Sequence, residues 1–206
     1  MQAGLVASIN RPGGNATGVS TADRLLGGKH LGLLHELLPR AQRFALLINP
    51  TNPLIPESYV AEVRAAASTI GAQIDIFHAS NNREIDAAYA TLVQNGVNAI
   101  MVSPDGLYIT RRVQLVTLEA HYSLPAIYTF REDAVAGGLM SYGASQAEQC
   151  RQTGLYVGRV LNGEKPADLP VLFPTRVEFV INLQTARLLG LTVPPGVLAI
   201  ANEVIE

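Results

Sequence analysis

The side chains best suited to chemistry occur in short polar stretches, each of which directly follows an apolar run. These stretches are Asn49–Pro53, Ser80–Asn81, Ser103–Gly106 and Thr129–Arg131. The carboxylate of Asp105 is suited to accept a hydrogen bond from a ligand amine, or simply to close a turn. The guanidinium of Arg131 can pair with a ligand carboxylate through two parallel hydrogen bonds, or form an ion pair on the surface.

No catalytic motif accompanies these residues. The sequence lacks G-x-S-x-G, H-E-x-x-H, C-x-x-C, the phosphate-binding G-x-x-x-x-G-K-[ST] and the dinucleotide-binding G-x-G-x-x-G. His30 and His35 are five residues apart, which does not put them on one helix face, and we interpret them as solvated or half-buried. We expect His78 and His121 to pack in the core or at its rim, and Cys150 to be a small buried residue. The sequence therefore predicts a protein that is not an enzyme and that has no cofactor and no metal site.

Two alternatives use Asp105. The phosphoacceptor of a receiver domain also follows a strand, but a receiver needs an acidic pair after its first strand and a lysine near its last. Here the corresponding segments read Asn49-Pro50 and Thr129–Arg131. A hydrolase or transferase on a similar sheet would need a base or nucleophile beside Asp105, and no motif supplies one.

The elements that position these residues alternate between strand and helix. Four apolar runs predict strands, at Arg43–Asn49, Ala72–Ala79, Val97–Ser103 and Pro125–Phe130. Helical spacing predicts helices between them, at Pro56–Ile70, Arg83–Gln94 and Thr110–Tyr122. This order predicts an α/β fold with a parallel sheet and helices on both faces. Ligands bind at the carboxyl ends of the strands in such sheets, so the polar stretches should meet at one edge.

The flanking segments contain further elements. Asn82 is the expected N-cap of the helix Arg83–Gln94, and Ser145 that of a helix reaching Leu161. In the helix Thr110–Tyr122 the expected inward residues are Val113, Val116, Leu118 and His121. The remaining expected helices are Ala3–Ile9, Leu25–Leu38 and Leu183–Leu189, with a helical turn at Arg131–Ala136 and a short final turn after Pro194-Pro195. The remaining expected strands are Asn15–Ser20, Leu139–Tyr142 and Val177–Asn182.

Composition excludes several classes of protein. The 206 residues are 48% hydrophobic and 16% charged, so the chain can bury a core and is not disordered. Its formal net charge is −2 and it has no basic run, so it lacks the electrostatic footprint of a nucleic-acid-binding protein. No apolar run reaches the ~18–20 residues that span a bilayer. A single cysteine excludes an internal disulfide and a cysteine-based zinc cluster.

Four segments together resemble the substrate-binding proteins of ABC importers, in the group with tryptophan-, tyrosine- and phenylalanine-binding members. They are GLVASINRPGGNATGVS (Gly4–Ser20), LLHELLPRAQRFALLINPTNP (Leu33–Pro53), PAIYTFREDAVAGGLMSYG (Pro125–Gly143) and LNGEKPADLPVLFPTRVEFVINLQTARLLGLTVPP (Leu161–Pro195). The resemblance implies a type I periplasmic-binding-protein fold, in which two α/β lobes close over a small ligand. It also implies an ABC permease as partner and a periplasmic or lipid-anchored location.

Matched to this fold, residues 1–42 are the expected remnant of an incomplete first lobe and residues 43–140 the second lobe. Residues 141–182 form the expected hinge crossing and return, and residues 183–206 the C-terminal helix and tail. Because no signal segment is present, we expect residues upstream, or else a cytosolic ligand-sensing module of the same fold. An exposed sheet edge on the incomplete lobe predicts a homodimer, which a single monomer peak in light scattering would contradict.

The resemblance also implies which residues line the ligand pocket of the second lobe and its hinge. The ligand is expected to be an amino acid or small carboxylate, with Ser103, Asp105 and Arg131 holding its charged groups. The full set is Asn49, Thr51, Asn52, Ser80, Ser103, Pro104, Asp105, Thr129, Phe130, Arg131 and Tyr142.

Overall fold

The computed structural model describes residues 5–20, 26–53, 57–173 and 176–206. The chain divides into two compact units. The larger unit contains Asp23–Gly143 and Glu178–Glu206, and the smaller unit contains Met1–Ala22 and Ala144–Val177.

The larger unit is built on a seven-stranded sheet, in the order β2-β1-β3-β4-β5-β6-β7. Adjacent strands are parallel in the pairs β1–β2, β1–β3, β3–β4, β4–β5 and β6–β7. The strands are β1 (Arg43–Ile48), β2 (Gln73–His78), β3 (Ala99–Val102), β4 (Ala126–Tyr128), β5 (Met140–Ala144), β6 (Val177–Asn182) and β7 (Glu203–Ile205). The expected α/β fold with a mostly parallel sheet is therefore confirmed.

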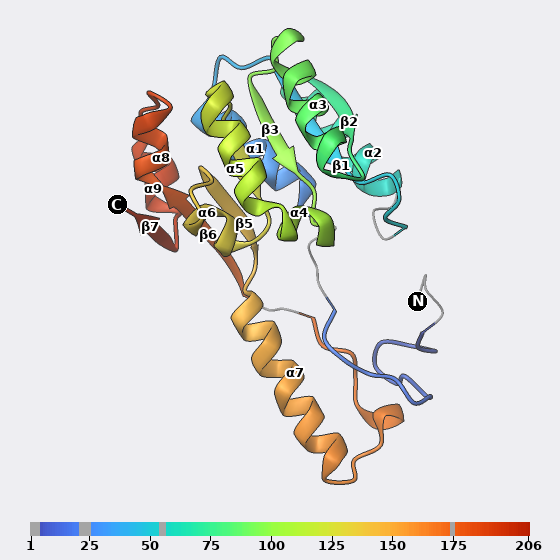
Figure 1. Cartoon of the computed structure of the whole chain (residues 1–206). Coiled ribbons are helices and arrows are strands. Elements are labelled where there is room, and N and C mark those ends of the chain that lie inside the picture. The colour runs from blue at the N-terminus through green and yellow to red at the C-terminus, as the bar shows by residue number, and fades with distance from the viewer. Residues whose placement is uncertain (1–4, 21–25, 54–56, 174–175) are drawn as a thin grey trace. The chain divides into compact units, whose positions relative to one another are not determined.

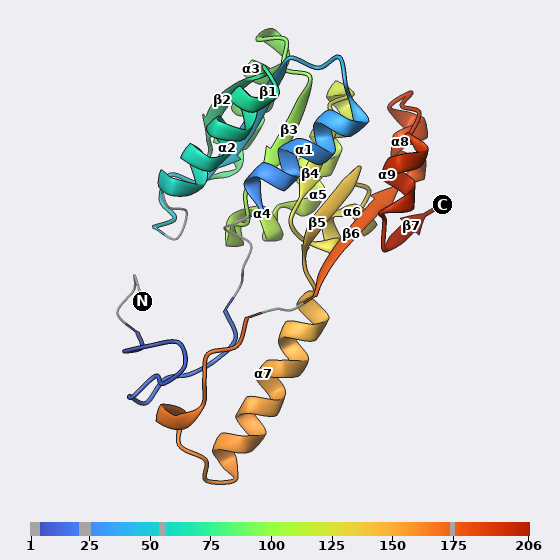
Figure 2. The same ribbon diagram turned by 180° about the vertical axis from the view of Figure 1, so that it is seen from behind.

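Helices cover both faces of this sheet. Figure 1 shows α3 (Asn82–Gln94) and α5 (Arg112–Tyr122) in front of the strands. Figure 2, from behind, shows α1 (Gly27–Leu37) and α2 (Glu57–Thr69) on the opposite face. The shorter helices of the larger unit are α4 (Gly106–Thr110), α6 (Arg131–Val135), α8 (Leu183–Leu188) and α9 (Pro195–Ala199).

Two apolar cores lie on the two faces of the sheet. One joins α1 and α2 to the strands through residues such as Leu34, Val63 and Met101. The other joins α3 and α5 to the strands through residues such as Tyr89 and Leu115. All four residues of β3 are buried, as expected for a central parallel strand that is covered on both sides. This packing holds the ends of β1, β3 and β4 in fixed positions.

The smaller unit contains α7 (Gln146–Leu161) and a short 3₁₀ turn, Pro166–Asp168. The Tyr156 hydroxyl donates to the Pro170 carbonyl at 2.7 Å, which fastens the returning chain to α7. The N-terminal segment joins this returning chain through the Thr17 hydroxyl, which donates to the Leu169 carbonyl at 2.6 Å, and through a parallel bridge between Val19 and Leu172.

Several boundaries differ from those expected. Residues 5–9 of the expected helix Ala3–Ile9 are not helical, and the expected strand Asn15–Ser20 is reduced to the single bridge at Val19. The expected helix Thr110–Tyr122 is replaced by α4 and α5, which meet at Arg111. The cap of α3 is Asn81, whose side chain accepts from the Glu84 N–H, so Asn82 is the first helical residue. Ala3, Gly4, Leu25 and Pro56 lie outside the described residues.

Burial also corrects the expectations for individual side chains. His30 is fully buried, whereas His78, His121 and Cys150 are exposed. Cys150 lies on α7, where Tyr156 is the only described residue that is buried. His30 is buried because α1 packs against the sheet of the larger unit, although residues 1–42 were assigned to a first lobe.

Candidate functional site

The site is built at the point where the strand order reverses. Chain that leaves β1 passes to β2 on one side, and the next strand, β3, lies on the other side of β1. Such switch points in parallel sheets leave a crevice at the carboxyl ends of the two strands. Here the loop after β1 carries Asn49 and Asn52, and the loop after β3 carries Asp105.

The Asp105 carboxylate joins these two loops. Its Oδ1 accepts from the Asn49 amide at 3.1 Å, and its Oδ2 accepts from the Asn52 amide at 2.6 Å. Asp105 is also the N-cap of α4, because Oδ1 accepts from the Leu107 N–H at 2.8 Å. Asn49 Oδ1 accepts in turn from both the backbone N–H and the hydroxyl of Thr51. The structure thus brings four of the predicted site residues into one hydrogen-bonded group.

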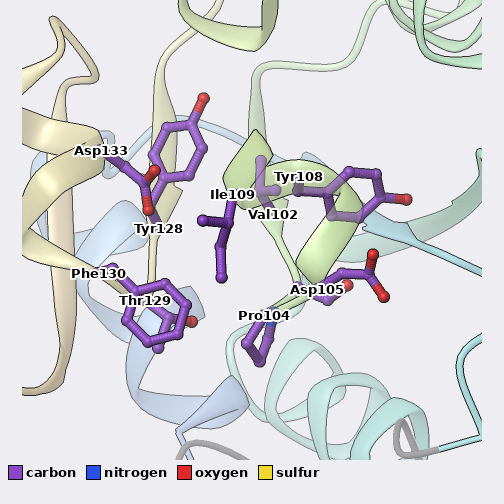
Figure 3. A pocket seen from close by; sticks show the side chains of 10 residues that line it. Val102, Pro104, Asp105, Tyr108, Ile109, Tyr128, Thr129, Phe130 and Asp133 are labelled. Atoms are coloured by element: carbon purple, nitrogen blue, oxygen red, sulfur yellow. The ribbon is translucent and has the colours of Figure 1, made fainter. Parts of the chain in front are cut away.

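A cavity of about 10 Å³ lies beside this group, between the ends of β3 and β4 (Figure 3). In Figure 3 Asp105 and Thr129 lie on opposite sides of the cavity, and the carboxylate of Asp105 points away from Thr129. The lining residues are Val102, Ser103, Pro104, Asp105, Tyr108, Ile109, Tyr128, Thr129, Phe130 and Asp133.

Two buried hydroxyls in this lining have no hydrogen-bond partner among the described residues. Ser103 and Thr129 are 2% and 3% exposed. Each is the first residue after its strand. Because Met101 pairs with Ile127 in the register, Ser103 and Thr129, which follow two residues later on each strand, lie side by side. Buried hydroxyls are normally hydrogen-bonded, so this pair is suited to bind a ligand atom or a water molecule.

A buried carboxyl group lies behind the cavity. Glu119 of α5 accepts at Oε1 from the hydroxyls of Tyr89 and Tyr128, at 2.9 and 2.5 Å. Burial raises the pKa of Glu119 to about 8, although the two tyrosine hydrogen bonds act in the opposite direction. Asp133 accepts from Arg112 at 2.5 Å, but its pKa is still raised by burial. Sequence reasoning missed Glu119 because a glutamate on an amphipathic helix is usually exposed.

Three other predicted residues have partners within the chain. Arg131 forms a bidentate ion pair with Glu203 of β7, with both N–O distances at 2.6 Å. The Ser80 hydroxyl and backbone N–H both donate to Glu84 at the start of α3. The carbonyl of Tyr142 accepts from His30 Nε2 at 2.5 Å. A role for these residues in ligand contact stays a prediction.

No group of three or more His, Cys, Asp or Glu side chains among the described residues is arranged to hold a metal ion. No helix in the described part of the chain is long and apolar enough to cross a membrane. The chemistry available at the carboxyl edge of the sheet is therefore hydrogen bonding by hydroxyls, amides and a carboxylate, beside the aromatic rings of Tyr108, Tyr128 and Phe130. This composition is typical of a small-molecule binding site.

The fold is that of the periplasmic-binding-protein class. Residues 1–205 match the model of a family described as ABC transporter substrate binding protein, and the chain belongs to that family. Because members of this family bind solutes and are not enzymes, the expectation that the chain is not an enzyme is confirmed.

Comparison with individual proteins gives relatives of the same kind. A tyrosine-binding protein from Clostridioides difficile (strain R20291) is 25% identical over 191 residues, which are 93% of this chain and 54% of the relative. A Streptococcus pneumoniae ABC domain solved in complex with L-Trp is 29% identical, with a TM-score of 0.84 over 98% of this chain and 69% of that one. A Vibrio cholerae protein has the same fold at 23% identity, with a TM-score of 0.84 over 97% of this chain and 66% of that one. The chain thus spans about half the length of the curated relative.

Proposed function

We propose that this chain acts in an ABC importer by binding an amino acid at the carboxyl edge of the larger unit's sheet, outside the cytoplasm, and by presenting it to a membrane permease. The observation that carries this proposal is the pair of buried hydroxyls of Ser103 and Thr129, which line a cavity at that edge and have no hydrogen-bond partner among the residues that the structure describes. The printed ligands of two relatives, tyrosine and L-Trp, support an amino acid with an aromatic side chain.

The local charge favours the amino group of such a ligand near Asp105. Asp105 is 6% exposed, and its carboxylate accepts three N–H groups from the described residues, all of them uncharged, so these partners do not neutralise its negative charge. A buried carboxylate attracts a cation more strongly than an exposed one does. The hydroxyls of Ser103 and Thr129 both donate and accept, so they suit either charged end of an amino acid.

Thermal melting with added amino acids tests the proposal. A ligand present at about 100 times its Kd stabilises the folded protein by ~2.7 kcal/mol, which raises Tm by about 5–10 °C in a chain of this size. We expect L-Trp, L-Tyr or L-Phe to raise Tm, and aliphatic amino acids and small carboxylates to act less. A well-folded sample whose Tm responds to none of them would contradict an amino-acid ligand.

Two conservative substitutions locate the binding site. Ser103→Ala and Thr129→Val remove the hydroxyls while nearly preserving volume, and each should weaken ligand binding about tenfold, since a ligand hydrogen bond is lost. Thr117→Val on the exposed face of α5 is the matched control, because its hydroxyl donates only to the Val113 carbonyl in its own helix. If calorimetry gave Thr129→Val and Thr117→Val the same affinity for the ligand, Thr129 would not be a ligand-binding residue.

A further inference from the structure

His30 is a buried histidine that the proposed binding site does not use. It lies in the first turn of α1 and is fully buried. Its Nε2 lies 2.5 Å from the Tyr142 carbonyl oxygen. Since a carbonyl oxygen only accepts, Nε2 carries the proton, and the neutral ring is left with Nδ1 as an acceptor. Nδ1 has no hydrogen-bond partner in the described part of the structure.

Burial keeps this donor uncharged. It lowers the pKa of His30 to about 4, while the hydrogen bond to Tyr142 acts in the opposite direction. The imidazole is therefore neutral at physiological pH, and its single N–H donates a hydrogen bond to the Tyr142 carbonyl. A helix that brings a neutral donor to the backbone of a strand forms a directed contact without the cost of a buried charge.

Aromatic packing extends this contact to a second strand. The ring of Tyr142 meets the ring of His30 edge to face, with centroids 6.1 Å apart. It also packs against Phe179 of β6, with centroids 6.3 Å apart. The backbone N–H of Phe179 donates to the Asn202 side chain at 2.8 Å, which ties in the C-terminal segment. His30 thus joins α1 to both β5 and β6.

These contacts lie where the chain passes out of the larger unit and back into it. Gly143 is the last residue of the larger unit before α7, and Glu178 is the first residue after the return. Tyr142 and Phe179 are the neighbours of these two boundary residues. The cluster His30–Tyr142–Phe179 therefore fixes both strands within one residue of the larger unit's boundary.

Thr129 holds the same strand from a second direction. A Cβ atom on Gly143 would lie 2.1 Å from the Thr129 carbonyl oxygen and 2.8 Å from its Cγ2. The backbone of Gly143 thus passes directly against the end of β4 at Thr129, whose hydroxyl has no hydrogen-bond partner in the described part of the structure. Any change in the course of β5 at Tyr142 and Gly143 therefore moves the surroundings of Thr129.

We propose that His30 is a positioning residue, which clamps Tyr142 so that β5 keeps one course past Thr129. The part that concerns ligand binding depends on the proposed function, whereas the clamp itself does not. In the ligand-free protein, the clamp should make hydrogen exchange slow at the backbone amides of residues 140–145.

A pair of substitutions tests the clamp. His30→Leu fills similar space but has no donor, whereas His30→Gln retains an N–H group within reach of Tyr142. Loss of one hydrogen bond should speed amide exchange at residues 140–145 about three- to tenfold in His30→Leu, with a smaller change in His30→Gln. Ligand affinity should follow the same order, because Thr129 moves with β5.

His35→Leu is the matched control. His35 lies on the same helix and packs against Phe44, with centroids 6.5 Å apart, away from β5. The clamp is refuted if His30→Leu and His35→Leu alter exchange at residues 140–145 equally, or if His30→Leu and His30→Gln behave alike. If the wild type binds no amino acid, the proposed function fails, while the exchange rates of the free protein still decide the role of His30.

Discussion

Glu119 places a carboxyl group between two tyrosine hydroxyls behind the edge where the candidate site lies. Because its pKa is raised from 4.5 to about 8, the folded protein retains a proton that the unfolded chain loses above pH 4.5. Stability should therefore fall as pH rises from 4.5 to 8. His30, with its lowered pKa, acts in the opposite direction between pH 4 and 6.5, so the effect of Glu119 is best measured above pH 6.5.

Glu119→Gln should remove this pH dependence. An amide at position 119 still accepts from Tyr89 and Tyr128 but has no proton to lose. We expect the wild type to lose about 2 kcal/mol of unfolding free energy between pH 6.5 and 8, and Glu119→Gln to lose much less. Urea unfolding at several pH values measures this difference. The exposed substitution Glu36→Gln is the control, and equal slopes for all three proteins would show that Glu119 does not hold its proton.

Gly143 offers a steric test at the same scale. It has no positive φ, so the close approach of Thr129, and not backbone conformation, excludes a side chain. Gly143→Ala should cost more than about 2 kcal/mol, because the new methyl group meets a backbone oxygen. Gly32→Ala is the matched change, since a Cβ there meets no atom within 4 Å and α1 gains a better helix former.

Thermal or urea unfolding compares the two alanine variants. Gly32→Ala should be as stable as the wild type or up to about 1 kcal/mol more stable. The steric interpretation would be wrong if Gly143→Ala kept the stability of the wild type. Weaker ligand binding by Gly143→Ala, measured well below its Tm, would in addition indicate that the course of β5 matters for the site.

At the scale of elements, the strands were the easiest part to predict. The strands β1 and β3 are short apolar runs followed by Asn49 and Ser103, and their observed bounds lie within the predicted runs. The helix Thr110–Tyr122 was predicted less well, because Asp105 caps a separate helix, α4, that ends at Thr110. The break at Arg111 resets the helical phase, so Val113 is 75% exposed while Leu115 and Glu119 face inward.

The sequence was enough to predict where the candidate site lies, but not which partners its charged groups have. Parallel strands place their carboxyl ends at one edge, which was enough to bring Asn49, Ser103, Asp105 and Thr129 together. The partners of the charged groups were not predictable, because they come from distant parts of the sequence. Arg131 pairs with Glu203, which is 72 residues away, and such a pairing follows only from the position of β7 beside β6.

At the scale of the whole chain, the two units differ in how much they bury. The larger unit contains two apolar cores, whereas α7 buries only Tyr156 among its described residues. Several large apolar side chains of the smaller unit are exposed, among them Leu161 at 81% and Leu155 at 52%. Local stability follows the number of buried contacts, so the smaller unit should open more readily than the sheet.

Hydrogen exchange of the intact chain measures this difference. Amides in α7 should exchange through local opening at a low free energy, whereas those in β1 and β3 should exchange only when the larger unit unfolds. Lowering global stability with a little urea should therefore speed exchange in the strands but leave α7 almost unchanged. If α7 is instead protected as well as β3 and responds equally to urea, the two units unfold together. The exposed leucines on α7 would then have to be covered in solution, which sedimentation of the same sample would detect as self-association.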